Sequence, residues 1–194
     1  METLVLRDSV TGSMTDEEFL RFCVENPGLR IERNSNLEII IMSPVSTLSG
    51  LHSSEVFGQL FQWNKKNRKG LVFDSSTGFT LPDRSVFSPD AAFVTLAQWS
   101  MLTNEDKNRF APLCPSFVIE VRSKSDVFED LKEKMVVWVE NGCRLAWLID
   151  PLEKNTYIFR PDSAVEMIGG FDQVIAGEND VEGFRLDLAS LEQH

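Results

Sequence analysis

The order of predicted elements indicates an α/β fold, with a mixed central β-sheet flanked by helices. An N-terminal helix and β-hairpin precede a long helix, three strand-like segments, a second long helix and further strands. Such alternation favours a layered α/β architecture. The nearly all-apolar segment RLAWLIDP is typical of a strand that is buried on both faces of a sheet. With 194 residues, 42% of them hydrophobic and 25% charged, the chain can bury a full core as one domain.

The first predicted elements are a short helix and a hairpin. Thr15 is a candidate N-cap, acidic residues fill the first turn, and Pro27-Gly28 ends the helix. The segment LRIERNSNLEIIIMSP predicts two strands joined by a turn at residues 34–36. We expect a single domain in three parts: the helix and hairpin (1–48), a core (51–160) and a C-terminal extension (161–194).

The remaining elements alternate between helix and strand. Apolar residues at helical spacing predict a helix over residues 51–67. The second long helix begins after Asp126, a candidate cap, and Asn141-Gly142 ends it. Further expected elements are strand-like segments at 71–81, 85–95 and 116–122, an irregular linker or short helix at 96–115, the helix at 128–140, RLAWLIDP, its antiparallel partner NTYIFRP, and a tail at 163–194 with a short hairpin.

Charge and cysteine content limit the class of protein. The net charge of −11 argues against a surface that is basic overall, although it leaves room for a local basic patch. Cys23, Cys114 and Cys143 have no metal-binding spacing, so we expect reduced, mostly buried thiols in a cytoplasmic protein. There is no run of 18 apolar residues and no signal-peptide pattern, so we expect neither a membrane span nor secretion.

Two acidic residues lie where predicted core strands begin or end. Asp90 follows Pro89 beside small residues, and Glu120 closes the apolar run FVI. Because burying an unpaired carboxylate costs several kcal/mol, Glu120 needs a cation. Two carboxylates on neighbouring strands would form a partial shell for Mg²⁺. The alternatives are a turn aspartate at position 90 and a structural ion pair between Glu120 and Arg122.

The helix at 128–140 supplies a basic residue. At 100° per residue, Lys134 falls at the border of the apolar stripe beside Trp138, whereas Glu129, Glu133 and Glu140 lie on the opposite face. Lys134 can therefore reach toward the sheet. The alternative is that its aliphatic part only covers Trp138.

Taken together, SPDAAFV, FVIEVRSKSD and LKEKMVVWVENGCRLAWLIDP resemble a family of bacterial proteins described as putative restriction endonucleases, within the PD-(D/E)XK nuclease superfamily. The resemblance runs from about Phe19 to about Arg160. It implies a restriction endonuclease-like core, metal-dependent cleavage of phosphodiesters and a homodimer.

The resemblance assigns roles residue by residue. Asp90 takes the place of the aspartate of the motif and Glu120 that of its second acid, while Arg122 stands where the superfamily has lysine. Arginine cannot act as a base near neutral pH, although it could stabilise phosphate charge. The lysine would then come from the following helix, as Lys134, with Lys132 less well placed.

The implied site holds Mg²⁺ or Mn²⁺ between the carboxylates and one main-chain carbonyl near Val121. Lys134 would orient the attacking water or help to deprotonate it, and Arg122 or Lys124 would contact phosphate. Glu55, on the first long helix, is a further candidate ligand, with a solvated glutamate as its alternative. We expect His52 to be partly exposed and no ligand.

Three functions follow from these residues. The first is a metal-dependent endonuclease that cleaves phosphodiester bonds in DNA. The second, suggested by Arg122 and the acidic charge, is an inactive nuclease-fold protein that binds nucleic acid or serves in assembly. The third is a nuclease for RNA or a small phosphodiester. The run KKNRK at 65–69 is a candidate DNA contact, or else a favourable ending of its helix.

Overall fold

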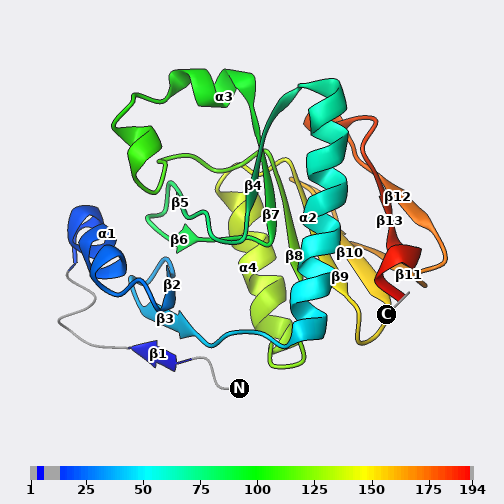
Figure 1. Ribbon diagram of the computed structural model, residues 1–194, viewed down its shortest axis with the longest axis horizontal. Coiled ribbons are helices and arrows are strands. Elements are labelled where there is room, and N and C mark those ends of the chain that lie inside the picture. Colours follow the sequence, from blue (N-terminus) through cyan, green and yellow to red (C-terminus); the bar gives the residue numbers. More distant parts are fainter. Residues whose placement is uncertain (1–3, 7–13, 193–194) are drawn as a thin grey trace.

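Figure 1 shows a computed structural model of the chain, which describes residues 4–6 and 14–192. Its helices are α1 (Asp16–Glu25), α2 (Thr47–Asn67), α3 (Leu96–Met101) and α4 (Phe128–Glu140), with short 3₁₀ helices η2 (Asp106–Asn108), η3 (Asn179–Val181) and η4 (Leu188–Glu192). Its strands are β1 (Leu4–Leu6), β2 (Arg30–Arg33), β3 (Ile39–Met42), β4 (Gly70–Asp74), β5 (Phe79–Thr80), β6 (Val86–Phe87), β7 (Ala91–Thr95), β8 (Phe117–Val121), β9 (Leu145–Asp150), β10 (Asn155–Phe159), β11 (Glu166–Gly169), β12 (Val174–Ala176) and β13 (Arg185–Asp187).

A six-stranded sheet in the order β11-β10-β9-β8-β7-β4 forms the centre of the fold. Strands β8 and β9 run parallel, with Glu120 opposite Leu148 in their register, and the neighbouring pairs are antiparallel. The crossover between β8 and β9 contains α4, as a parallel pair requires. The predicted mixed sheet flanked by helices is therefore confirmed.

Alternation along the strands divides the core between the two faces of this sheet. Ile119 and Val121 of β8 point to the face that is covered by α2 and the C-terminal segment, where they join a cluster with Trp147 and Phe184. Val118 points to the opposite face, which α4 covers (Figure 1). Trp138 of that helix is fully buried there. Because successive residues of a strand face opposite ways, Glu120 must point to the side of α4.

A second sheet, β1-β3-β2-β6-β5, lies beside the first. The segments 71–81 and 85–95, each predicted as one strand, are in fact divided between the two sheets. The Asp74 side chain accepts a hydrogen bond from Ser76 N and turns the chain between β4 and β5. Pro89, which cannot donate to a strand ladder, lies between β6 and β7. Asp90 therefore lies where the chain crosses from one sheet to the other.

Several local expectations are confirmed. Thr15 caps α1 in a capping box with Glu18. The hairpin at 30–42, the short helix in the linker and the antiparallel pair β9–β10 are as predicted. Gly142, with φ of +108°, follows the end of α4. The three cysteines are free thiols, and Cys114 and Cys143 are buried.

Other local expectations are wrong. Helix α2 begins at Thr47, not at residue 51, because Ser46 caps it. Asp126 does not cap α4: its carboxylate accepts a hydrogen bond from Ser123 N instead, and no side chain caps this helix. His52 is buried, not partly exposed. In the described part of the chain, no helix combines the length and apolar character that crossing a membrane would need.

Candidate active site

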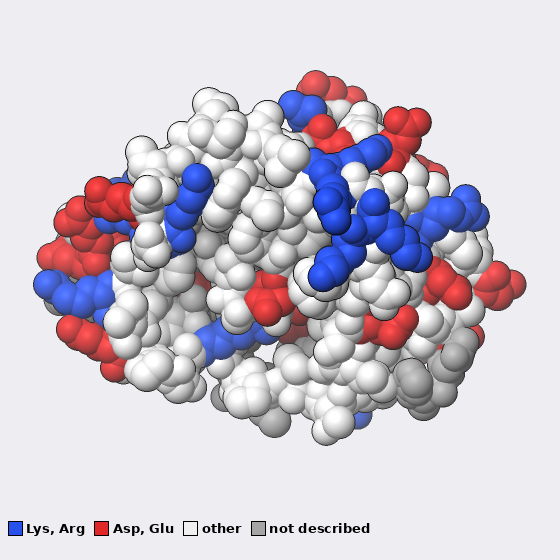
Figure 2. All heavy atoms as spheres, turned by 45° about the horizontal axis from the view of Figure 1, so that its top comes forward, with Lys and Arg blue, Asp and Glu red and all other residues white. Residues whose placement is uncertain are grey.

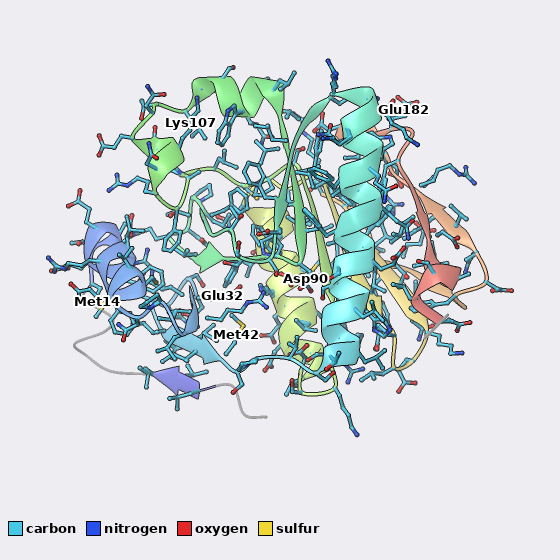
Figure 3. The ribbon with its side chains drawn as sticks, in the orientation of Figure 1. Met14, Glu32, Met42, Asp90, Lys107 and Glu182 are labelled. Carbon is cyan, nitrogen blue, oxygen red and sulfur yellow. The ribbon has the colours of Figure 1, made fainter. Side chains whose placement is uncertain are left out.

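Asp90 and Glu120 line one cavity of about 80 Å³ between the two sheets, the start of α2 and α4. Asp90 comes from the crossing between the sheets, and Glu120 from the end of β8. Figure 3 shows Asp90 in the middle of the molecule, with Glu32 of β2 to its left. The remaining lining residues are Arg30, Met42, Ser43, Val45, Ser49, Ser53, Val121, Ser123, Ser125, Asp126, Leu131 and Lys134.

A main-chain amide fixes the orientation of Asp90. Its Oδ2 accepts a hydrogen bond of 2.8 Å from Val121 N, and Ser53 of α2 lines the same cavity. Withdrawal from water raises the pKa of Asp90, while the bond from Val121 acts in the opposite direction. The hydrogen bond from Val121 places the Asp90 carboxylate next to the end of β8, the strand that carries Glu120.

Glu120 is a buried carboxylate with two donors. Its Oε1 lies 2.9 Å from Lys134 Nζ and 3.3 Å from the indole nitrogen of Trp138. Burial raises the pKa of Glu120 to about 7; Lys134 opposes this shift, and the nearby carboxylates of Asp90 and Glu32 add to it. Both contacts use Oε1, so the second oxygen can bind a ligand.

Lys134 lies between two carboxylates. Its ammonium is 2.9 Å from Glu120 Oε1 and 3.0 Å from Glu32 Oε1, and its side chain is 14% exposed. Burial alone would lower the pKa of Lys134, but Glu120 and Glu32 together raise it. The lysine therefore carries its positive charge at neutral pH, so it can donate hydrogen bonds but cannot take up a proton.

Comparison with known proteins identifies the family. Residues 16–189 match the family described as "Putative restriction endonuclease", Uma2. This chain belongs to that family. A crystal structure of a protein from Anabaena variabilis ATCC 29413, described as a putative nuclease of DUF820, is similar with a TM-score of 0.75 and 21% identity, covering 92% of this chain and 97% of the other. None of the curated proteins matches the chain.

Membership of the Uma2 family and the restriction endonuclease-like fold together support a nuclease. Asp90, Glu120 and Lys134, which the resemblance singled out, lie together at the cavity. Val121, the expected source of a carbonyl ligand, lines it as well. Their roles in catalysis and metal binding stay predictions.

The structure does not bring Arg122 to this cavity. Its guanidinium lies 2.7 Å from Asp150 Oδ2 at the end of β9 and stacks over the ring of Phe128. The suggested pair with Glu120 is therefore wrong: Glu120 pairs with Lys134, and Asp150 on the neighbouring strand β9 pairs with Arg122. Arg122 in this member of the Uma2 family is bound to a structural partner.

Three further candidates lie elsewhere. Glu55 is not among the residues lining the cavity: its carboxylate accepts a hydrogen bond from Gln59, which also binds Asp187 and Ser190 near the C-terminus. Lys132 pairs with Glu129 on the outer face of α4. Lys124 is exposed, on the loop between β8 and α4.

Sequence reasoning missed two residues of β2, Glu32 and Arg30. Glu32 is 2% exposed and accepts hydrogen bonds from Lys134 and from Ser88 N, while Arg30 donates to Ser88 O. Both side chains therefore hold the residue that precedes Pro89-Asp90. The available signal was the alternation in RIER, which puts Arg30 and Glu32 on one face of a strand that the hairpin pattern already predicted.

The donor set suits a hard divalent cation. Asp90 and Glu120 supply carboxylate oxygens, and Mg²⁺ commonly binds through one or two carboxylates and keeps several waters. Within residues 4–6 and 14–192, no group of three or more acidic, histidine or cysteine side chains is arranged to hold a metal. The remaining ligands would thus be a carbonyl, water and substrate. The cavity has room for them, since one water needs only about 10–15 Å³ of such volume.

Proposed function

We propose that the protein is a metal-dependent endonuclease that hydrolyses phosphodiester bonds in DNA. The observation that carries the proposal is the meeting of Asp90, Glu120 and Lys134 at one cavity, from two neighbouring strands and the helix that follows them. Membership of the Uma2 family supports the same reaction.

Each residue has a role in this proposal. Asp90, Glu120 and the Val121 carbonyl hold Mg²⁺ or Mn²⁺, which when bound lowers the pKa of a coordinated water and polarises the phosphate. Lys134 orients the attacking water and balances the negative charge of the transition state. Because the carboxylates raise the pKa of Lys134, it does not serve as the general base.

The test is cleavage of plasmid DNA with Mg²⁺ or Mn²⁺ by the unchanged chain and by Glu120→Gln, with Glu129→Gln as the matched control. Glu129 is an exposed carboxylate on the outer face of α4. We expect Glu120→Gln to lower the rate by at least about a hundredfold, the scale of losing an electrostatic contribution at the reacting centre. The control should cleave at the unchanged rate. Cleavage that survives Glu120→Gln would reject the assignment.

A basic cluster supports DNA as the substrate despite the net charge of −11. Lys65, Lys66, Arg68 and Lys69 are exposed at the C-terminal end of α2, where Figure 2 shows lysine and arginine side chains gathered on one face. At 1.5 Å per residue, Lys65 lies about 18 Å along the helix from Ser53 at the cavity. A duplex that spans several base pairs could contact both. We also propose that the protein is a homodimer, and sedimentation as a monomer would contradict this part of the proposal.

The alternative is an inactive protein that binds nucleic acid or serves in assembly, and the position of Arg122 favours it. In that case the buried charges would only hold the two sheets together. Calorimetry that finds no binding of Mg²⁺ or Mn²⁺ at millimolar concentration, together with an Asp90→Asn variant that is as stable as the unchanged chain or more so, would support this alternative over catalysis.

A further inference from the structure

Glu32 is a buried carboxylate that the proposed reaction does not use. It comes from β2 in the second sheet, 102 positions before Lys134 in the chain. Its side chain lies next to Lys134 but is not among the groups that line the cavity. Burying a carboxylate is costly unless hydrogen bonds and a cation compensate for the lost water. The burial of Glu32 therefore has to be explained by the groups that its carboxylate binds.

Glu32 connects two parts of the candidate site through one oxygen. Its Oε1 accepts a hydrogen bond of 2.8 Å from Ser88 N, two residues before Asp90, and lies 3.0 Å from Lys134 Nζ. The same ammonium is 2.9 Å from Glu120 Oε1. Glu32 therefore fixes the approach to Asp90 and shares the ammonium with Glu120.

This sharing has a consequence for cation binding at Glu120. An ammonium with only one carboxylate partner would depend on Glu120 alone, and a divalent cation at the other oxygen of Glu120 would compete with it for the charge of that carboxylate. With Glu32 as a second partner, the ammonium stays paired when Glu120 also binds a cation. The buried pair thus remains compensated in both states.

We propose that Glu32 is a positioning residue that acts through Lys134: it holds the ammonium so that the Glu120 carboxylate can bind a divalent cation. The inference deepens the proposed function and rests on it, since it concerns the same cation site. Groups that orient the primary ligands in this way commonly change metal affinity by 10–100-fold when they are replaced.

The test is calorimetric titration of Mn²⁺ into the full chain and three variants. Glu32→Gln removes the charge, and Glu32→Asp keeps it but withdraws the carboxylate from Lys134 by one methylene group. Glu38→Gln, on the same hairpin and hydrogen-bonded to Asn34, is the matched control. We expect affinity about tenfold weaker for both Glu32 variants, and unchanged affinity for Glu38→Gln. Unchanged affinity for Glu32→Asp would mean that Glu32 acts only through its charge, and would overturn the proposal.

A second set of variants tests the route through Lys134. In a Lys134→Met background, Glu32→Gln should change Mn²⁺ affinity by less than about threefold, because coupled residues are not additive. An undiminished effect in that background would overturn the proposal. Failure of the unchanged chain to bind Mn²⁺ would refute the proposed function and the inference with it, whereas normal binding by every Glu32 variant would refute the inference alone.

Discussion

Lys134 and Arg160 each lie between two carboxylates, but in different surroundings. Lys134 lies between Glu32 and Glu120, and the three side chains are 14%, 3% and 6% exposed. Arg160 binds Glu166 and Glu178 near the surface, where the exposed fractions are 24%, 51% and 40%. The first cluster joins the two sheets and α4. The second joins the end of β10 to β11 and to the segment before η3.

The two clusters differ in whether water can hydrate the carboxylates once their cation is removed. If Arg160 is removed, Glu166 and Glu178 can be hydrated, so the loss is small, as for most exposed ion pairs. If Lys134 is removed, Glu32 and Glu120 remain as two buried carboxylates without a cation. A cluster of the first kind is costly to keep for stability alone, which agrees with a role for the Lys134 cluster in a reaction.

The largest expected effect comes from Lys134→Met. Removing one partner from a buried ion pair costs about 3–5 kcal/mol of folding free energy, whereas an exposed pair contributes about 0–1 kcal/mol. We therefore expect Lys134→Met to lower the free energy of unfolding several times more than Arg160→Met. Urea unfolding of both variants at pH 8 without metal measures the difference.

Lys132→Met, two residues before Lys134 and on the outer face of α4, is the control, and its stability should lie close to that of the unchanged chain. A further variant that combines Lys134→Met with Glu32→Gln and Glu120→Gln removes all three charges, and should recover much of the lost stability. Equal losses for Lys134→Met and Arg160→Met would show that burial does not separate the two clusters.

A smaller effect is expected from pH at Glu120. Because burial raises the pKa of Glu120 to about 7, the folded chain holds this proton more tightly than the unfolded chain. The group therefore favours folding below its ordinary value of 4.5, and this contribution is lost as the pH rises to about 7. Glu120→Gln does not titrate, so it should gain stability relative to the unchanged chain between pH 5 and pH 8, by an amount of the order of 2 kcal/mol.

Thermal unfolding in EDTA at a series of pH values measures this difference. The free energy of unfolding of Glu120→Gln minus that of the unchanged chain should increase with pH across that window. Glu129→Gln, at an exposed position on α4, should show no such slope. A slope of the opposite sign for Glu120→Gln would mean that Lys134 keeps the carboxylate ionised and holds its pKa below the ordinary value.

Local periodicity made three residues of the site candidates but left a structural alternative open for each. Strand alternation and the apolar stripe of α4 pointed to Asp90, Glu120 and Lys134 from neighbours within one element, and the family resemblance then singled them out. The same arithmetic, applied to α2, shows why Glu55 fails. Ser53 lines the cavity together with Asp90, and Glu55 lies two residues further on, which is about 200° around the helix.

Contacts between distant elements could not be read from the sequence. Glu32 meets Lys134 because the second sheet lies against the first, and Arg122 finds Asp150 because β9 lies beside β8 in parallel register. The breaks between β4 and β5 and between β6 and β7 were missed for the same reason. A strand-like pattern does not say which sheet its two halves join, although Pro89 marked one of the breaks.

The smallest expected effect concerns the exposed cluster. Arg160 lowers the pKa of Glu178 through hydrogen bonds of 2.6 and 3.0 Å, against the effect of partial burial. The pair therefore stabilises the fold above the ordinary value of 4.5, and this contribution is lost as the pH falls below it. We expect Glu178→Gln to cost under about 1 kcal/mol at pH 7, and less in 1 M salt, where charges are screened over about 3 Å. Urea unfolding at low and high salt measures it, and a loss of about 3 kcal/mol that salt does not reduce would place this cluster with the buried one.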